Sequence, residues 1–361
     1  MKNKNIVIFT KTNWNESPRI RHQLTRLLSS YGHNVTFFEK SCSTQLKTIK
    51  YKKDKINFIR HFELFHHQLR PFEFLVKLNQ FVAKYFIQKN IKNENIDLVI
   101  NFNYDYPFLK DLFPDKKVIT IINDDFVSQA KFWMTKSIRN QLLDTCKNSD
   151  LVLAVSYPLV EQLKEYNQNT HIFLPWAQNE YIEPTIVAIK KDVVLYWGFI
   201  DHRIDWDVIE YLLKKKIKLR FVGSVQTKIF SKIEKCNEYT TFELIDPSSL
   251  ETLNMDDIVC SLLPYDPKRN EMNAVTVNNR VFQLLSYGLP LVYSNLPNLL
   301  KSPTTVISKC KTNEEYFNVI KYFSNNFDLV QSDIKIFLKD HYAQNRYEYF
   351  TNKIEEIDSD N

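Results

Sequence analysis

The sequence predicts an α/β protein made of two doubly wound domains, and two observations lead to this prediction. First, short apolar runs alternate with segments of helical periodicity, which is typical of βαβ units around a parallel sheet. Second, this alternation stops near residues 175–190 and then begins again, which indicates a second domain of the same class. The 361 residues are enough chain for each domain to bury its own core.

The first half opens with a strand, a polar loop and a helix. Residues 6–9 are apolar, residues 10–17 are polar, and apolar residues with helical spacing follow from Ile20 until Gly32 ends the helix. A second strand at 35–38 completes a βαβ unit. The other strands expected in this half lie at 97–102, 117–122, 150–155 and 170–174, with a helix beginning after Ser156.

The second half repeats the alternation. A strand at 193–197 ends at Gly198, a helix covers 206–213, and a strand at 219–222 ends at Gly223. The remaining expected elements are strands at 242–245, 257–263 and 289–293, a helix at 280–285, and a charged surface helix at 333–357.

Glycine is unusually rare. Average usage of about 7% would give about 25 glycines, whereas the chain has four, at positions 32, 198, 223 and 288. Neither G-x-G-x-x-G nor G-x-x-x-x-G-K-[ST] therefore occurs, which excludes both common glycine-rich phosphate loops. An AT-rich genome explains the low count, because Lys, Asn, Ile, Phe and Tyr are abundant, but it does not explain which positions keep glycine.

Cysteine usage indicates a reducing compartment. The five cysteines lie far apart and form no C-x-x-C pair, which argues against a zinc site or a disulfide framework. Scattered thiols suit the cytoplasm. We find no signal peptide pattern and no run of the roughly 18 apolar residues that a membrane span needs. We therefore expect a cytoplasmic protein, at most peripheral on the inner face of a membrane.

Positive charge is concentrated between Lys47 and Lys92. This segment holds eleven Lys or Arg and three acidic residues, a difference of +8, whereas the whole chain carries +6. Aromatic residues such as Phe74 and Phe81 are interleaved with the charges. On helices, this pattern is typical of a surface that meets an anionic membrane or nucleic acid, and the alternative is that the rings belong to the core. Because no nucleic-acid-binding motif is present, we expect an anionic membrane surface and no nucleic acid as partner.

Three segments carry a recognisable pattern. Residues 13–38 combine a loop, a helix and the sequence Y-G-H-N-V-T-F-F. Residues 148–156 read N-S-D-L-V-L-A-V-S, and residues 171–178 read H-I-F-L-P-W-A-Q. Residues 262–292 include N-N-R-V-F-Q-L-L-S-Y-G-L-P-L-V. Together with the closing helix around Arg346, these segments resemble the family 4 glycosyltransferases of the GT-B fold.

The resemblance implies a two-domain enzyme with a cleft between Rossmann-like domains. Residues 1–178 would form the acceptor side, residues 179–332 would bind the donor, and a helix in residues 333–361 would return to the first domain. It implies transfer of a sugar from a nucleotide sugar to a glycan or lipid-linked acceptor, as in the synthesis of capsule, lipopolysaccharide or a similar surface polysaccharide. It also implies a retaining reaction, in which the leaving phosphate can take the acceptor proton.

The chain departs from the family pattern at two places. The family has two glutamates eight positions apart, and these positions fall here near Val275 and at Gln283. The glycines of the family's opening loop are replaced by residues 15–18. The first departure concerns contacts to the sugar and ribose, and the second concerns the acceptor side.

Donor chemistry needs fixed positive charge, because departure of a nucleoside diphosphate builds up negative charge. Arg280 is expected at the start of a helix, whose unpaired N–H groups also attract phosphate, and Arg203 follows the turn at Gly198. We take both arginines as candidate catalytic residues, although either could be an ordinary surface arginine. The candidate donor-binding residues are Gly198, Gly223, Ser224, Thr276, Asn278, Asn279 and Gln283.

Candidates for the acceptor side follow strands of the first domain. His22, on the first helix, could contact the acceptor or act as a general base, and Asp125 could take the same role. Glu16, Arg19 and Asp124 are the other acceptor-side candidates. The alternative is a structural histidine with carboxylates that cap helices.

We expect no metal and no other cofactor beyond the nucleotide sugar itself. The D-x-D triplet from Asp205 to Asp207 begins a predicted helix, where its carboxylates are expected to cap the helix rather than bind a cation. Two other functions stay open on the sequence. One is a nucleotide-sugar epimerase or phosphorylase of the same fold, and the other is a non-catalytic binding or scaffold protein, which the missing glutamates would suit.

Overall fold

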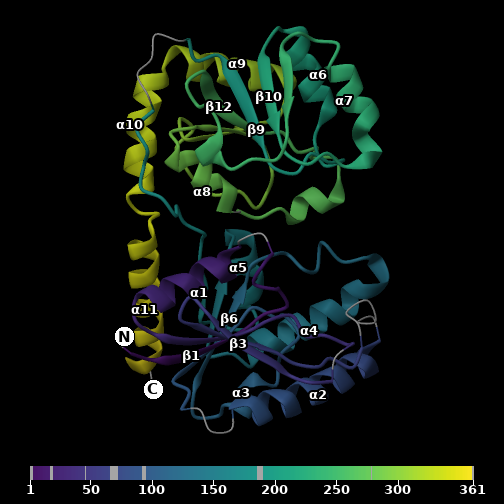
Figure 1. Cartoon of the computed structure of the whole chain (residues 1–361), viewed down its shortest axis with the longest axis vertical. Helices are drawn as coiled ribbons and strands as arrows, with labels where there is room; N and C mark the ends of the chain where they lie inside the picture. The colour runs from purple at the N-terminus through teal and green to yellow at the C-terminus, as the bar shows by residue number, and fades with distance from the viewer. Residues whose placement is uncertain are drawn as a thin grey trace. The chain divides into compact units, whose positions relative to one another are not determined.

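The computed structural model describes residues 3–16, 19–44, 46–65, 72–91, 95–184, 190–277 and 279–359. The chain divides into two compact units (Figure 1). The first unit contains Met1–Pro175 and Arg346–Asn361, and the second contains Trp176–Asn345. Each unit is built around its own mainly parallel sheet, which confirms the predicted α/β class with two doubly wound bodies.

The described part of the first unit contains an eight-stranded sheet in the order β3-β4-β2-β1-β5-β6-β7-β8. Its strands are β1 (Asn5–Phe9), β2 (Asn34–Phe38), β3 (Ile49–Lys53), β4 (Ile56–Arg60), β5 (Leu98–Asn101), β6 (Lys117–Ile122), β7 (Leu151–Ala154) and β8 (Thr170–Ile172). All neighbours pair in parallel except β3 with β4. The central strands β1 and β5 to β7 are almost continuously buried, as expected for strands covered on both faces.

Helices cover both faces of this sheet. They are α1 (Ile20–Ser30), α2 (Glu73–Ile91), α3 (Leu109–Leu112), α4 (Thr135–Lys147), α5 (Tyr157–Lys164) and α11 (Ala343–Ser359). Val7 and Phe9 of β1 pack in one cluster with Ala83, Ile87 and Ile91 of α2. Because side chains alternate along a strand, Ile8, which lies between Val7 and Phe9, faces the opposite helical layer.

The pair β3–β4 differs from the sequence prediction, which placed the basic segment 47–92 on helices. Residues 49–60 instead form an antiparallel hairpin, and α2 follows it. The hairpin turns at Asp54 and Lys55, which have φ values of 49° and 66°. A two-residue hairpin turn needs positive φ at both positions and usually has Asn-Gly or Asp-Gly there. This turn therefore lacks the glycine that would have marked it in the sequence.

The described part of the second unit contains a parallel six-stranded sheet in the order β11-β10-β9-β12-β13-β14. Its strands are β9 (Val193–Trp197), β10 (Lys218–Val222), β11 (Phe242–Ile245), β12 (Ile258–Leu263), β13 (Leu291–Ser294) and β14 (Ile307–Cys310). Its helices are α6 (Trp206–Lys214), α7 (Phe230–Cys236), α8 (Asn279–Ser286), α9 (Asn313–Asn325) and α10 (Phe327–Leu338). The strand order changes direction at β9, so the ends of β9, β10 and β12 lie together, where ligands of such sheets bind.

The C-terminal segment also differs from the prediction of one surface helix at 333–357. Two helices occur, because α10 ends at Leu338 and α11 begins at Ala343. One side of α11 is buried in the first unit, where Phe350 packs on Phe173 with ring centroids 5.7 Å apart. Tyr347 stacks on Tyr31 and its hydroxyl lies 2.8 Å from His33 Nε2. The helix is therefore a packed part of the first unit despite its many charges.

Candidate functional site

Two glycines stand at the carboxyl ends of neighbouring strands in the second unit. Gly198 follows β9 and Gly223 follows β10, with φ values of 140° and 155°. A Cβ atom on Gly223 would overlap the carbonyl oxygen of Gly198, and a Cβ atom on Gly198 would overlap Arg280 Nη1. Gly198 N donates to Val222 O at 2.9 Å, which holds the two turns together. Both positions therefore require glycine for space as well as for backbone conformation.

Arg280 lies over this glycine pair from the first turn of α8. Its Nη1 donates to Trp197 O at 2.7 Å and its Nη2 donates to the hydroxyl of Tyr265. The guanidinium also lies 5.7 Å from the ring centroid of Tyr196 and 5.9 Å from that of Tyr265. No carboxylate among the described residues forms an ion pair with it. The strand ends therefore carry a fixed and uncompensated positive charge.

Arg203 lies beside the same tyrosine but is paired. Its Nε donates to Asp201 Oδ2 at 2.8 Å, and its Nη2 lies 2.6 Å from the same oxygen. The guanidinium is 6.0 Å from the Tyr265 ring centroid. Burial alone would lower the pKa of Arg203, but the hydrogen bonds and charge of Asp201 raise it above the ordinary value. Asp201, which is buried, thus fixes one of the two arginines in place.

The other donor-side candidates lie close to these residues in the chain. Ser224 is exposed directly after Gly223, and its carbonyl accepts a hydrogen bond from Ile200 N at 2.9 Å. Thr276 is buried ahead of α8, Asn279 begins that helix, and Gln283 is half-buried one turn after Arg280. Asn278 lies outside the described residues.

Sequence reasoning did not select Asp201, Tyr196 or Tyr265. Tyr265 could have been found from position, because it follows the buried strand β12 at the carboxyl edge of the sheet. Tyr196 carries no such signal, since a tyrosine within an apolar strand is indistinguishable from a core residue. Its hydroxyl donates to Phe199 O at 2.7 Å and so supports the turn at Gly198.

In the first unit, charged groups gather where α1 begins and where β6 ends. Arg21 is buried, and its pKa is lowered to about 10 by desolvation and by the charge of Arg19. Asp124, after β6, has a raised pKa because of burial, which the charges of Arg21 and Arg19 partly offset. Arg21 Nε is buried and makes no hydrogen bond within the described chain. Arg21 is thus a further candidate that the sequence did not reveal.

His22 has a structural environment that differs from the catalytic role expected of it. The side chain is fully buried, and its Nδ1 accepts a hydrogen bond from Arg19 N at 3.1 Å. Its ring centroid lies 5.2 Å from that of Trp14, and burial lowers its pKa. His22 therefore joins the start of α1 to the loop before it, which favours a positioning role over that of a solvent-accessible base.

The remaining acceptor-side carboxylates stabilise local turns. Glu16 Oε1 accepts hydrogen bonds from the backbone and side-chain nitrogens of Asn13 at 3.1 and 3.2 Å. Asp125 Oδ1 accepts one from Ser128 N at 3.0 Å, and Asp124 Oδ2 accepts one from Asn123 Nδ2 at 2.8 Å. Glu16 is exposed and Asp125 is half-buried. Glu16 is therefore the most accessible of these three carboxylates.

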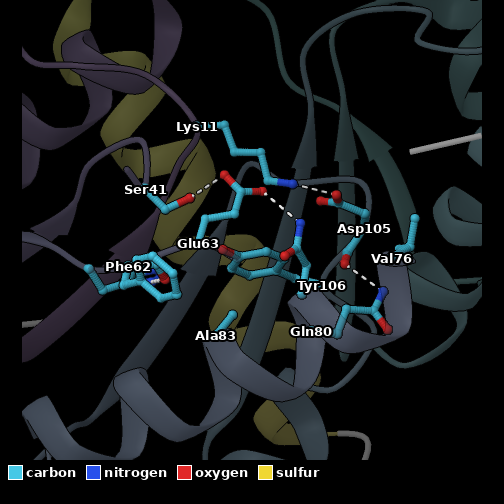
Figure 2. A pocket seen from close by; sticks show the side chains of 11 residues that line it. Lys11, Ser41, Phe62, Glu63, Val76, Gln80, Ala83, Asp105 and Tyr106 are labelled. Atoms are coloured by element: carbon cyan, nitrogen blue, oxygen red, sulfur yellow. Dashed lines mark hydrogen bonds and ion pairs between the residues drawn. The ribbon is translucent and has the colours of Figure 1, made fainter. Parts of the chain in front are cut away.

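A small polar pocket lies at the carboxyl edge of the first sheet. Figure 2 shows Lys11 pointing toward Asp105, and Ser41 pointing toward Glu63. Asn79 Nδ2 also donates to Glu63 Oε1 at 3.2 Å. The cavity measures about 20 Å³, so it has room for a water molecule rather than a sugar ring. The pocket is therefore a small polar cavity lined in part by residues that follow the strands of the first sheet.

Comparison with solved structures identifies the fold. Sucrose-phosphate synthase from Thermosynechococcus elongatus superimposes with a TM-score of 0.70 at 12% identity, over 99% of this chain and all of that one. The lipopolysaccharide outer core galactosyltransferase WaaB superimposes with a TM-score of 0.67 at 12% identity, over 98% of this chain and 99% of that one. The chain has a GT-B fold. HepE of Anabaena, whose structure was solved in complex with UDP and glucose, gives a TM-score of 0.60 at 10% identity, over 98% of this chain and 100% of that one.

The sequence itself gives no closer assignment within the GT-B fold. No protein-family model matches the chain, and no curated protein matches it in sequence. Among the described residues, no helix is long and apolar enough to cross a membrane. In the same residues, no group of three or more His, Cys, Asp or Glu side chains is placed to hold a metal ion. Asp205 caps α6, as expected, by accepting hydrogen bonds from Asp207 N and Val208 N.

Proposed function

We propose that this chain is a glycosyltransferase that moves a sugar from a nucleotide-sugar donor to a glycan or lipid-linked acceptor. The observation that carries the proposal is the glycine–arginine site of the second unit, formed by Gly198, Gly223, Arg203 and Arg280. The GT-B fold supports it, because structures of this fold include a sucrose-phosphate synthase, a galactosyltransferase and a complex with UDP and glucose. We further propose a role in surface polysaccharide synthesis at the cytoplasmic face of a membrane.

The site provides what a leaving diphosphate needs. The two glycines carry no side chain at the strand ends, and Arg280 Nη1 occupies the space that a Cβ atom on Gly198 would fill. A phosphate at this edge of the sheet would therefore meet the guanidinium. Arg280 adds a positive charge without a carboxylate partner, and the N-terminus of α8 adds its helix dipole. Such preorganised groups stabilise the charge that develops as the bond from the anomeric carbon to phosphate breaks. Donor departure in this proposal requires no metal ion.

The proposed reaction retains the anomeric configuration. The acceptor oxygen forms the new bond to the anomeric carbon on the face that the diphosphate leaves, and the acceptor proton passes to the leaving phosphate oxygen. Gln283, one turn after Arg280, would hydrogen-bond the ribose, together with contacts from Ser224, Thr276, Asn278 and Asn279. In the first unit, Arg19 and Arg21 would hold an anionic acceptor, and Glu16, Asp124 and Asp125 would contact its hydroxyls. NMR of the product would show the opposite anomer if this assignment is wrong.

The proposal is tested by Arg280→Gln. A screen of nucleotide sugars by thermal shift first identifies the donor, since a ligand at a hundred times its dissociation constant stabilises the protein by about 2.7 kcal/mol. Loss of a transition-state donor costs roughly a hundred- to a thousandfold in rate, so we expect kcat to fall by about that factor with the melting temperature retained. Nucleotide release measures the rate.

Arg139→Gln is the matched control, because Arg139 is exposed on α4 and takes no part in the proposed site. It should leave kcat unchanged. Unchanged turnover in Arg280→Gln would remove Arg280 from the mechanism. If no nucleotide sugar is bound or hydrolysed by the purified protein, the scaffold alternative replaces the enzymatic one.

A further inference from the structure

Helix α2 has an apolar outer face in addition to its buried one. Its buried residues are Val76, Ala83, Ile87 and Ile91, whose spacing forms one stripe against the sheet. The opposite stripe carries Phe74 and Phe81, which are 70% and 74% exposed, and Tyr85, which is 55% exposed. Large aromatic residues repeated at helical spacing on the solvent side of a helix have no role in the core of this unit.

Lysines accompany these rings at the same spacing. Lys77 follows Phe74 by three positions and Lys84 follows Phe81 by three, so both ammonium groups flank the aromatic stripe. The edge strand β3 adds one lysine near the end of the helix, since Lys50 Nζ donates to Asn90 O at 3.3 Å. Neither Lys77 nor Lys84 forms an ion pair with a described residue.

The stripe runs into an apolar groove at the C-terminal end of α2. The groove has a volume of about 730 Å³, within the range of about 300–1,000 Å³ that is typical of ligand sites. Ile91, Ile96 and Phe113 form its floor, and Tyr85 belongs both to its wall and to the exposed stripe. The groove is thus continuous with the aromatic face.

The rim of the groove is basic. Lys89 and Lys116 line it beside the polar Gln88, and no described carboxylate pairs with either lysine. This apolar groove, with ammonium groups at its rim, would suit a molecule that has a hydrocarbon chain and an anionic head group. Among biological surfaces, an anionic phospholipid bilayer supplies both groups side by side.

We propose that the outer face of α2 and the adjoining groove dock this protein on an anionic phospholipid bilayer. Phe74, Phe81 and Tyr85 enter the boundary between headgroups and acyl chains, and the groove takes an acyl chain of one lipid. Lys77, Lys84, Lys89 and Lys116 lie at the headgroup phosphates. The proposal extends the proposed function, which puts the acceptor at a membrane, but vesicle binding can be measured without any transfer activity.

The test is co-sedimentation of the full chain with vesicles of phosphatidylcholine alone and with added phosphatidylglycerol. We expect binding only to the anionic vesicles, and weaker binding as salt shortens the Debye length from about 10 Å at 0.1 M. Lys77→Gln and Lys84→Gln should each weaken binding by about fivefold, as should Lys89→Gln and Lys116→Gln. Phe74→Ser combined with Phe81→Ser should weaken it by at least tenfold.

The matched control is Leu329→Ser combined with Ile336→Ser on α10. These residues are also apolar, exposed and seven positions apart, at 68% and 60% exposure, but neither of them lines the groove at the end of α2. The control should bind vesicles like the unmodified chain. Phe81→Trp gives a second measurement that needs no loss of apolar surface: its fluorescence should be quenched by brominated acyl chains in anionic vesicles.

Several outcomes would overturn the proposal. These are absence of binding to anionic vesicles, equal binding to neutral ones, or full binding by the α2 variants. If the α2 substitutions change the oligomeric state instead of vesicle binding, the face is an interface between copies of this chain. Donor hydrolysis in detergent reports separately on the proposed function, and it should be unaffected by every α2 variant.

Discussion

At the residue scale, the ends of β9 and β10 depend on two glycines, which have no side chain. Gly198 and Gly223 leave a space that any Cβ atom would fill, and Arg280 occupies one side of it. Tyr265 contacts both positive groups, because its hydroxyl accepts a hydrogen bond from Arg280 Nη2 and its ring centroid lies 6.0 Å from the Arg203 guanidinium. A substitution of either glycine therefore acts on the arginines as well as on the backbone.

Gly198→Ala should impair both donor binding and folding. Its methyl group would overlap Arg280 Nη1, so the guanidinium leaves its position over the strand ends, and an alanine is strained at a φ of 140°. We expect donor affinity to fall by about tenfold or more, measured by calorimetry with the donor found in the thermal-shift screen. An unaltered affinity would mean that the position of Arg280 is not needed for binding.

Gly32→Ala is the companion variant for this experiment. Gly32 has a φ of 84°, but its Cβ atom would meet only Asn3 Oδ1 at 3.7 Å, an ordinary contact. The left-handed conformation costs an alanine about 1–2 kcal/mol. Because alanine also restricts the unfolded chain, which offsets about 0.4–1 kcal/mol of this cost, Gly32→Ala should lower the free energy of unfolding by about 0.5–1 kcal/mol and leave donor affinity unchanged.

Much of the candidate site was accessible from the sequence, but only as single residues. Arg203, Arg280 and both glycines were selected because they stand at predicted strand ends or a helix start. Their partners were not, because Asp201 and Tyr265 are recognisable only once the loops that carry them are placed. Arg21 was hidden for the same reason: a buried arginine on an amphipathic helix has the same sequence pattern as an exposed one.

At the element scale, three helices in the described part of the chain end at a residue with a left-handed backbone conformation, and only two of these residues are glycines. Helices α1 and α8 each end in a turn closed by paired backbone hydrogen bonds, at Gly32 and Gly288. Helix α6 ends in the same motif, in which Ile217 N donates to Leu212 O at 3.0 Å and Lys216 N donates to Leu213 O at 2.9 Å. Lys216 holds the left-handed position there, with a φ of 59°.

Lys216→Gly should stabilise the second unit. Glycine avoids the roughly 1–2 kcal/mol cost of the left-handed conformation, although it loses about 0.4–1 kcal/mol through the greater freedom of the unfolded chain. We expect a net gain of about 0.5–1 kcal/mol in denaturant unfolding. Lys215→Gly, one residue earlier with a φ of –80°, should destabilise instead. A gain at both positions would show that the side chains, and not the backbone, are responsible.

The elements that the sequence predicted are those with an apolar run or a clear end signal. Strands such as β6 and β9 were found at their observed bounds because apolar runs of this length are buried on both faces. The β3–β4 hairpin was missed because Asp54 and Lys55 take the positions where glycine normally signals the turn. The break between α10 and α11 was missed because the charged sequence around Lys339 continues without proline or glycine.

At the scale of the whole molecule, four histidines of the first unit couple its stability to pH. His22, His33, His61 and His171 all lie in that unit, and burial lowers the pKa of each below 6.5. The unfolded chain binds protons at these histidines more readily than the folded chain does. The free energy of unfolding therefore rises with pH between the lowered folded pKa values and 6.5.

The first unit should therefore lose stability in mild acid. The contribution of these four histidines is fully present above pH 6.5, and it is lost as pH falls through the unfolded value of 6.5 toward their lower folded values. Hydrogen exchange of backbone amides at pH 7.5 and 5.5, compared after correction for intrinsic rates, should show lower protection at pH 5.5 in β1 and β6. Unchanged protection in both strands would contradict this linkage.

The division of the chain at Pro175 and Arg346 has a consequence for synthesis on the ribosome. The second unit is a continuous stretch, so it can fold as soon as Asn345 has left the exit tunnel. The first unit must wait for α11, and until then Phe173 and Tyr31 lack their partners Phe350 and Tyr347. The unit translated first is thus the one completed last, and a nascent-chain chaperone would find its unfinished surface exposed while the whole of the second unit is being made.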